Sequence, residues 1–519
     1  MNKKIIITFL SGWILLLPAC TKDYLDTKPT SSTATSTIFE SVENISLAIN
    51  GINILMAMGY HLYDHGYGQM MYGEGGIKML YGNYPGNHYN VDLAGWSVII
   101  NGEWRELVTS VWDVYPWYYY YSIIGNANAI ILNTDKAKGA EADKQFVKAQ
   151  ALTYRAYAYF MLSQIYCYRW SDSNNGATQG LVLRLDTSTG DMPLSTLAQV
   201  YTQVYKDLDD AIALYASSGQ SRKYFYDPDK SVAYAIYARA AITKKDYTKA
   251  STMAVNARNG YPLMSNTDYK SGFNTPNSEW IWGSFSSVDE SQAWSSFFAY
   301  HGYNSNANAV RTTPKGISKE LFDKVPATDI RKSLFLDPAG YAPNVDYSTA
   351  NGRAVAGKAL YRDAFLKYPD LFSTALIYTH MNFKFKALDL PGVGNLNHFR
   401  SSEMYLIESE AKYFLNDTPG AQQALITLNK NSGRDPQYNC TKTGTALLEE
   451  IKLYRALELW GEGFDWFDLK RWGDNINRKS YANGGNFVSV LAVTLTPETG
   501  NKWTWMIPKK ETDYNFGIE

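Results

Sequence analysis

Apolar residues recur every three or four positions along much of the chain, which is the spacing of one face of an α-helix. The clearest case is residues 197–215, where the apolar positions are Leu197, Val200, Val204, Leu208 and Ile212. We place the N-cap of this helix at Ser195. Residues 104–133 and 141–168 predict a pair of helices, and small residues in the second one allow close packing. These small residues are Ala149, Ala151, Ala156 and Ala158.

The next segment matches the pattern of a tetratricopeptide repeat, which alternates bulky and small residues at fixed positions and ends on proline. The matching residues are Tyr234, Tyr237, Ala238, Ala250, Ala257 and Pro262. Residues 402–430 repeat the pattern more loosely, with Ala411 and Ala424 at small positions, and a last helix is expected from Ala446 to Trp460. Helix pairs of this kind bury their apolar faces by stacking on one another.

Two long segments lack this periodicity. Residues 59–103 and 265–400 are rich in Gly, Asn and Ser, and they also contain many aromatic residues. Loops of this length inside a compact protein are usually functional or disordered, and the aromatic content argues against disorder. The pattern therefore predicts a mostly α fold. A tetratricopeptide-like scaffold of about four helix pairs, over about 104–262 and 400–475, carries a large loop-rich ligand-binding region.

The N-terminus reads as an export signal. Lys3 and Lys4 precede a short apolar run, Ile5–Leu17, which is too short to span a bilayer. Leu17–Cys20 resembles a bacterial lipobox, so residues 1–19 are predicted to be a signal peptide and Cys20 the lipidated first residue. An ordinary signal peptide ending near a cysteine is the alternative. Residues 20–37 are rich in Ser and Thr and predict a flexible tether to a single body over 38–519.

Composition narrows the function classes. The net charge of −1 gives no field that favours nucleic acid. Besides Cys20 the chain has only Cys167 and Cys440, which either pair or stay as buried thiols. The 41 Tyr and 14 Trp outnumber the 21 Phe, and side chains with an apolar body and a polar tip suit packed helices with wet ends as well as ligand platforms.

No catalytic motif of a phosphate loop, a serine hydrolase or a zinc protease is present. His61 and His65 have the spacing of metal ligands on a helix, but their segment is Gly-rich and no third ligand is evident, so we predict no metal site. A glycosidase needs two carboxylates that flank the scissile bond. The candidates lie among basic residues at helical spacing, and we interpret them as solvated ion pairs. They are Glu458, Glu462, Asp465 and Asp468.

The aromatic residues of the irregular segments are the better candidates for function. A sugar ring has an apolar face that stacks on Trp or Tyr, while its hydroxyl groups need polar partners. The predicted ligand-binding residues are Trp96, Asn101, Trp282, Trp294, Tyr300, Asn304 and Arg311, with Phe298 beside them. The alternative for each aromatic is a core position where a loop covers a helix.

The C-terminal segment 455–473, RALELWGEGFDWFDLKRWG, resembles the signature of the SusD/RagB family. Further family-like pieces support the resemblance over nearly the whole mature chain. They are Cys20–Asp26, Tyr154–Tyr166, Phe399–Leu415, Asn431–Asp435 and Ile507–Pro508 with Glu511.

The resemblance implies an outer-membrane lipoprotein that faces the exterior and caps a SusC-like TonB-dependent transporter. The usual cargo is an oligosaccharide, and some members take peptides. It implies no catalysis and no cofactor beyond the lipid on Cys20. Three hypotheses stay open: a glycan-binding protein, a peptide-binding protein of the same architecture, and a surface glycosidase.

Overall fold

The computed structural model describes residues 35–57, 73–289, 293–339, 359–499 and 501–518. Helices dominate this part of the chain, so the predicted mostly α fold is confirmed. The longer helices are α3 (Val42–Ala57), α6 (Val111–Thr134), α7 (Glu141–Tyr166), α8 (Leu197–Ser218), α9 (Lys230–Lys244), α10 (Tyr247–Ala257), α16 (Ala359–Lys367), α17 (Ser401–Phe414), α18 (Thr418–Ile426), α19 (Gly444–Glu458) and α20 (Asp465–Trp472).

Short helices and strands form the remainder. The short helices are α2 (Thr35–Ile38), α4 (Gly73–Gly76), α5 (Ser97–Ile100), α11 (Asn266–Tyr269), α12 (Phe297–His301), α13 (Asn308–Arg311), α14 (Lys319–Phe322) and α21 (Lys509–Tyr514). The strands form three antiparallel pairs: β1 (Tyr89–Val91) with β3 (Lys315–Ile317), β2 (Trp280–Ser284) with β4 (Leu396–Arg400), and β5 (Ile476–Asn477) with β6 (Thr494–Leu495).

The predicted signal peptide and Cys20 lie outside the described residues. Of the predicted tether, the last residues belong to α2, which begins at Thr35. Within the described ranges, every helix is either too short or too polar to span a bilayer. Cys167 and Cys440 are both buried as free thiols, so the alternative of a disulfide between them is wrong.

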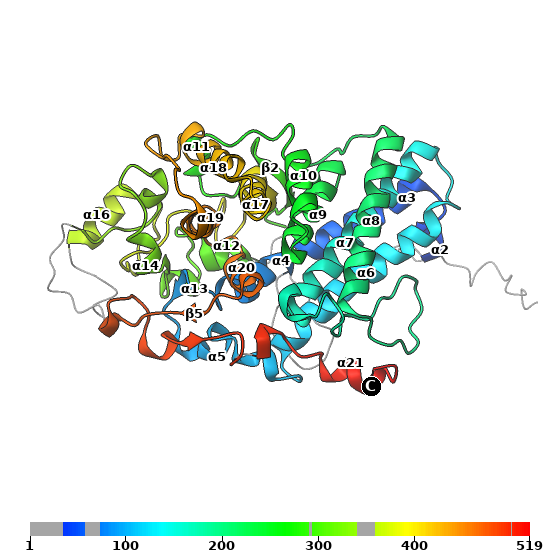
Figure 1. Ribbon diagram of the computed structural model, residues 1–519, viewed down its shortest axis with the longest axis horizontal. Helices are drawn as coiled ribbons and strands as arrows, with labels where there is room; N and C mark the ends of the chain where they lie inside the picture. Colours follow the sequence, from blue (N-terminus) through cyan, green and yellow to red (C-terminus); the bar gives the residue numbers. More distant parts are fainter. Residues whose placement is uncertain (1–34, 58–72, 290–292, 340–358, 500, 519) are drawn as a thin grey trace, which may run out of the picture.

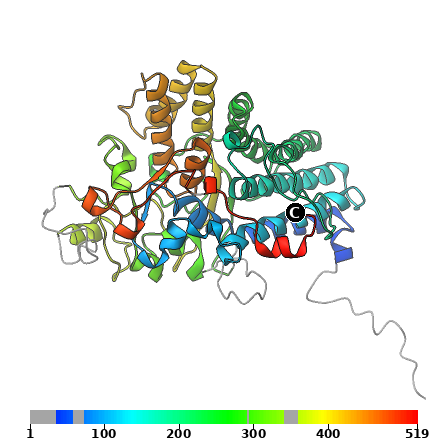
Figure 2. The same cartoon turned by 60° about the horizontal axis from the view of Figure 1, so that its bottom comes forward.

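The long helices pack in sequence order from α6 to α10, and α10 then packs against α17 (Figures 1 and 2). The array continues from α17 to α18 and α19. The whole segment 258–400 is therefore inserted between two helices that are neighbours in space. This insertion carries most of the predicted loop-rich region.

Local sequence explains the helix contacts. The small residues Ala238, Ala250 and Ala257 are fully buried, as the repeat pattern predicts. Arg155 of α7 makes a two-pronged ion pair with Asp207 of α8, at 2.8 and 2.7 Å, and donates to Asn128 of α6 at 2.9 Å. One buried guanidinium thus joins three consecutive helices.

Two predicted helix starts were wrong by a few residues. Thr196, not Ser195, caps α8, because its hydroxyl accepts from the Gln199 backbone N–H while the Gln199 side chain accepts from the Thr196 N–H. Ser195 instead donates its hydroxyl to the Leu181 carbonyl at 2.7 Å. Likewise α6 begins only after Ser110, which caps it through the N–H of Trp112.

The glycines of segment 73–86 serve a purpose that the loop prediction missed. Gly73–Asn83 form one helical stretch whose second half is a π-helix. At Gly82 a Cβ atom would lie 2.2 Å from the carbonyl oxygen of Gly463, and at Gly75 it would lie 3.2 Å from Cβ of Phe297. Glycine here permits a close approach between helix and backbone rather than a flexible loop.

A buried ion network ties the insertion to the helical array. Arg400, at the end of β4, contacts Glu279 at 2.8 Å, Glu458 at 2.6 Å and Glu462 at 2.7 Å. We call these residues, with their further partners, the Arg400 network. The further partners are Lys384, which contacts Glu462 at 2.7 Å, Arg331, which contacts Glu458 at 2.8 Å and Asp329 at 2.6 Å, and Arg434, which contacts Glu279 at 3.3 Å.

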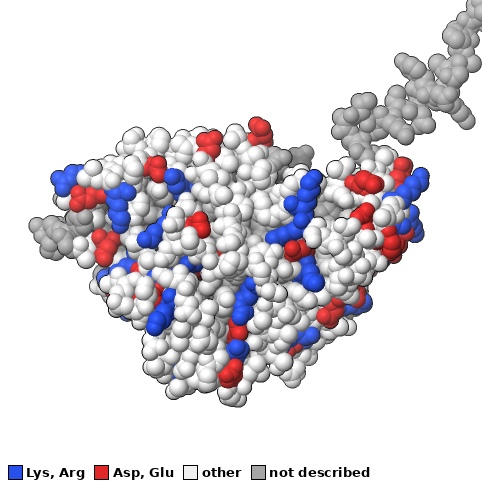
Figure 3. Space-filling view, turned by 90° about the horizontal axis from the view of Figure 1, so that it is seen from above, with Lys and Arg blue, Asp and Glu red and all other residues white. Residues whose placement is uncertain are grey.

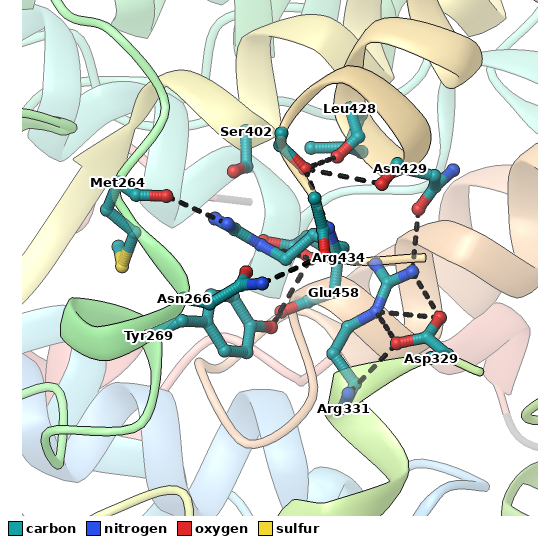
Figure 4. Close-up of polar contacts among 12 residues, drawn as sticks. Met264, Asn266, Tyr269, Asp329, Arg331, Ser402, Leu428, Asn429, Arg434 and Glu458 are labelled. Carbon is teal, nitrogen blue, oxygen red and sulfur yellow. Dashed lines mark hydrogen bonds and ion pairs between the residues drawn. The ribbon is translucent and has the colours of Figure 1, made fainter. Parts of the chain in front are cut away.

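The network holds four cationic and four anionic side chains, and each is at most 7% exposed. Figure 3 shows that on one outer face acidic and basic residues are interspersed without a large patch of one sign. Figure 4 shows Arg331 pointing to Asp329 and Asn429, and Arg434 reaching the Met264 carbonyl. Because its charges balance and most of its donors and acceptors are paired, the network tolerates its burial, although Arg434 Nε has no hydrogen-bond partner in the described part of the chain.

Removing the central guanidinium should destabilise the whole body. In Arg400→Ala, Glu458 and Glu462 lose their shared cation, and we expect the free energy of unfolding to fall by about 3–5 kcal/mol. Chemical denaturation followed by circular dichroism measures this. The matched control is Lys206→Ala, which breaks the exposed pair with Asp210 on α8 and should cost less than about 1 kcal/mol. Equal losses in the two variants would contradict the prediction.

Candidate functional site

Of the four carboxylates considered for catalysis, Glu458, Glu462 and Asp468 form buried ion pairs, and Asp465 is half-buried without an ion pair among the described residues, so the interpretation as solvated ion pairs was wrong. Glu458 and Glu462 belong to the Arg400 network. Asp468 accepts from Arg455 at 2.7 Å and from Arg471 at 2.8 Å, and Asp465 accepts from the His88 backbone N–H at 2.6 Å. Their spacing among basic residues correctly predicted that Glu458, Glu462 and Asp468 form ion pairs, but it gave no information about how deeply these groups are buried.

Electrostatics explains why these groups make a poor acid–base pair. Burial alone raises the pKa of Glu458, but Arg400, Arg434 and Arg331 outweigh burial and hold that pKa well below its usual value. The pKa of Glu462 is also lowered, because Arg400 and Lys384 outweigh its burial. Both glutamates are therefore ionised at neutral pH and offer no proton to a leaving group.

A cavity of about 260 Å³ lies beside Asp465 and Asp468. Burial raises the pKa of Asp465. Both oxygens of Asp468 are engaged by arginine, so Asp468 is not placed as a nucleophile or base. The two aspartates follow one another on α20 and do not face each other across a groove, which a glycosidase requires.

Among the predicted binding residues, Trp294 is the most accessible, with 58% of its surface exposed. It lies in the short turn before α12. Ser296 fixes this turn, because its hydroxyl accepts from the Ala299 N–H at 3.1 Å and donates to the Gly392 carbonyl at 2.5 Å. An exposed indole on a fixed turn has the form of a stacking platform.

Tyr300 on α12, Asn304 between α12 and α13, and Arg311 on α13 are half-buried. Asn304 is fully engaged: its amide donates to the Ala387 carbonyl at 3.0 Å and accepts from the Ala387 N–H at 2.8 Å. Arg311 donates to Thr374 at 3.2 Å and to Asn308. Asn304 thus holds the segment 387–395 against α12, while part of the Arg311 guanidinium points to polar neighbours at the surface.

The remaining predicted residues occupy other positions. Trp282 is 1% exposed and donates its indole N–H to the Tyr226 carbonyl at 2.9 Å, so it is a core residue in this structure. Asn101 is buried and accepts from Arg478 at 2.7 Å. Trp96 is half-buried and its ring lies 6.0 Å from that of Trp112. We leave Trp282 and Asn101 out of the candidate site.

Sequence reasoning missed the apolar neighbours of Trp294. Leu388 is 53% and Leu390 43% exposed, and they lie in the segment that Ser296 and Asn304 bind to α12. We call Trp294, Leu388 and Leu390 the Trp294 face. The signal in the sequence was weak, because two leucines around Asp389 and before Pro391 look like an ordinary turn. Only the hydrogen bonds of Ser296 to Gly392 and of Asn304 to Ala387 join this segment to the one that carries Trp294.

Within the described ranges, no three His, Cys, Asp or Glu side chains gather as a set of metal ligands. His61 and His65 lie outside those ranges. The other polar groups near the Trp294 face are amides, hydroxyls, the Arg311 guanidinium and the exposed Asp389 carboxylate. Such groups bind hydroxyl-rich or peptide-like ligands by hydrogen bonds.

Comparison with protein families gives two matches. Residues 23–242 match the SusD-like_3 model, described as starch-binding associating with outer membrane, and residues 392–518 match the model of the SusD family. No curated protein matches the sequence of this chain. The two family matches flank the inserted segment that holds the Trp294 face.

Solved structures share the fold. A SusD-like carbohydrate binding protein from Bacteroides vulgatus is 21% identical with a TM-score of 0.74, and the match covers 92% of this chain and 97% of that one. A putative sugar binding protein from the same species is 22% identical, with a TM-score of 0.70 and coverage of 92% and 98%. A SusD superfamily protein from Bacteroides thetaiotaomicron is 21% identical, with a TM-score of 0.71 and coverage of 92% and 99%.

Acid should weaken the fold through the same glutamates. Because the folded-state pKa of Glu458 is lowered, its contribution to stability is complete above the unfolded value of about 4.3 and is lost as pH falls below it. We expect Glu458→Gln to be less stable than wild type at pH 7 and the difference to shrink towards pH 3. Denaturant unfolding measured from pH 3 to 7 tests this, and a difference independent of pH would refute it.

Proposed function

Since this chain belongs to the SusD/RagB family, we propose that it is a cell-surface lipoprotein that binds an oligosaccharide and delivers it to a SusC-like TonB-dependent transporter. The family is described as starch-binding and associated with the outer membrane. The observation on this chain that carries the proposal is the Trp294 face. Its exposed indole lies on the turn before Ser296, whose hydroxyl donates to the Gly392 carbonyl of the segment 387–395 and accepts from the Ala299 N–H of α12.

The geometry of the Trp294 face supports sugar binding. A fixed aromatic ring stacks on the apolar face of a pyranose without losing much conformational entropy. Arg311 and Thr374, which lie within hydrogen-bond distance of each other, are polar partners for hydroxyl groups at the surface. Tyr300 and Asn304 support the site without being offered to the ligand. Tyr300 packs on the core, and Asn304 holds the segment 387–395 through its hydrogen bonds to the Ala387 backbone.

We propose that the protein acts without catalysis. The four carboxylates at the C-terminal signature are engaged by arginine, lysine or backbone groups, and Glu458 and Glu462 are buried within the Arg400 network. For this protein to be a glycosidase, a different pair of carboxylates would have to lie next to the Trp294 face. Release of reducing sugar by the purified protein would establish that reading.

Membrane attachment through Cys20 and capping of a transporter complete the proposal. They rest on the lipobox and on the family, whose members are associated with the outer membrane. Delivery to a barrel that faces the exterior requires the bound sugar to lie outside the cell. We therefore propose an outward orientation for the anchored chain.

A peptide is the second candidate cargo, and one observation favours it. Leu388 and Leu390 add exposed apolar surface on the segment that Ser296 binds, and apolar surface suits the side chains of a peptide better than it suits hydroxyl groups. Binding to a peptide digest, with no binding on a glycan array, would decide for this candidate.

Trp294→Ala should weaken binding of the cognate oligosaccharide by about tenfold or more, because a central stacked aromatic often contributes 2 kcal/mol or more. A glycan array identifies the ligand, and isothermal titration calorimetry measures the affinity of both proteins. Tyr514→Ala is the matched control, since Tyr514 is 81% exposed on α21, away from this face. Wild-type affinity in Trp294→Ala would place the binding site elsewhere.

Cys20→Ser should abolish incorporation of labelled palmitate and release the protein from the outer-membrane fraction. Wild-type protein solubilised from that fraction should copurify with the barrel transporter, whereas the variant should not be recovered with it from membranes. Fractionation, palmitate labelling and affinity purification give the three readouts. Palmitate labelling of the variant would show that another residue carries the lipid.

A further inference from the structure

Two large side chains on α21 and just after it are almost fully exposed. Tyr514 is 81% and Phe516 80% exposed, more than any other large apolar or aromatic side chain among the described residues. Single exposed apolar residues are normal on a protein surface. Two adjacent exposed aromatics on an ordered segment are unusual and point to a partner surface.

The backbone that carries them is held in place. The buried side chain of Asn515, between the two aromatics, accepts from the Met192 N–H at 2.9 Å and donates to Glu511 at 3.0 Å. The Phe516 N–H donates to Asp191 at 3.1 Å, and Trp117 donates to Glu511 at 3.2 Å. The segment is thus bonded to two other parts of the body, so the backbone that carries both rings is held in place.

Other apolar side chains extend this surface. The backbone around Met506 pairs with residues 105–108, and Met506 and Leu107 are 44% and 50% exposed. Next to them lies a groove of about 650 Å³, and its lining includes Tyr166, Leu194, Trp505, Met506, Ile507 and Ile518. We call Leu107, Met506, Tyr514 and Phe516 the α21 face. Lys509 and Asp513 on α21 pair at 2.6 Å, so they add no net charge to it.

The position of α21 relative to the proposed anchor indicates which partner this face contacts. In Figures 1 and 2, α21 and α2 both lie in the right-hand half of the molecule, at the opposite end from α16. The described chain begins at α2, and only 14 residues separate it from Cys20. Even fully extended, that length reaches roughly 50 Å. This step rests on the proposed lipidation of Cys20, which would keep this end of the body close to the membrane.

We propose that the α21 face is a lipid-contact surface that rests on the head-group region of the bilayer carrying the anchor. Aromatic rings are favoured at this depth, where an apolar body and a polar rim meet a mixed environment. Together with the lipid on Cys20, the α21 face sets which side of the protein faces the bilayer.

The test uses the chain from residue 20 onward carrying Cys20→Ser, so that no acyl chain contributes. Cys167 and Cys440 are 1% and 4% exposed, so a cysteine at the exposed position Thr512 is labelled selectively with an environment-sensitive fluorophore. Phosphatidylethanolamine–phosphatidylglycerol vesicles should raise the fluorescence, with little change in 0.5 M NaCl, because the contact is apolar. A label at Gln423 on α18 should not respond.

Tyr514→Ala with Phe516→Ala should weaken vesicle binding at least about tenfold, since burying each ring contributes on the order of one such factor. Leu366→Ala is the matched control, because Leu366 is 75% exposed on α16 and should leave binding unchanged. Thermal unfolding and oligosaccharide binding of the double variant should match wild type, which confirms that it folds.

Absence of vesicle binding by the wild-type face, loss of binding in high salt, or wild-type binding by the double variant would each overturn the proposal. Lack of palmitate on Cys20 would overturn it together with the proposed anchor. Oligosaccharide binding is measured separately on the same preparations. A failure of the lipid contact is therefore distinguishable from a failure of the proposed cargo function.

Discussion

A buried arginine needs carboxylate partners to offset the cost of burying its charge, and Arg400 pairs with three carboxylates from separate parts of the chain. Glu279 precedes β2 in the insertion, while Glu458 and Glu462 belong to the C-terminal signature. Lys384, Arg331 and Arg434 then balance the remaining charges. Because an unpaired charge at this depth is costly, the helical array and the insertion must fold into one arrangement in which all these groups meet. The network accounts for Glu458 and Glu462, two of the charged residues of the segment 455–473.

The scaffold could be predicted from the sequence because its information is local. Alternation of small and bulky residues over Tyr234 to Ala257 sets one helix pair by itself, and the apolar spacing from Leu197 sets α8. The glycines before Gly86 misled the prediction, because a glycine that allows a close approach looks the same in sequence as one that opens a loop. The approach of Gly82 to Gly463 depends on residues far apart in the chain.

The binding residues were harder to predict for the same reason. Trp282 and Trp294 both look like platforms in the sequence, but β2 directs the first into the core and the turn before α12 directs the second outwards. Asn304 has the right chemistry for a sugar, yet both ends of its amide bind the Ala387 backbone. Exposure and hydrogen-bond partners depend on the tertiary structure, whereas the sequence gives only the residue type at each position.

The contact between α10 and α17 has a consequence for how such a protein diversifies. Residues 258–400 leave and re-enter the array at two helices that already touch, so the ends of the insertion are fixed whatever lies between them. The entropy of closing a loop rises only with the logarithm of its length, so this segment can gain, lose or exchange residues at little cost to the array. Arg400 lies where the chain re-enters the array, and its pairing with Glu279 requires the insertion to keep a carboxylate at that position. Selection can therefore change the residues of this one segment while the helical array is inherited unchanged.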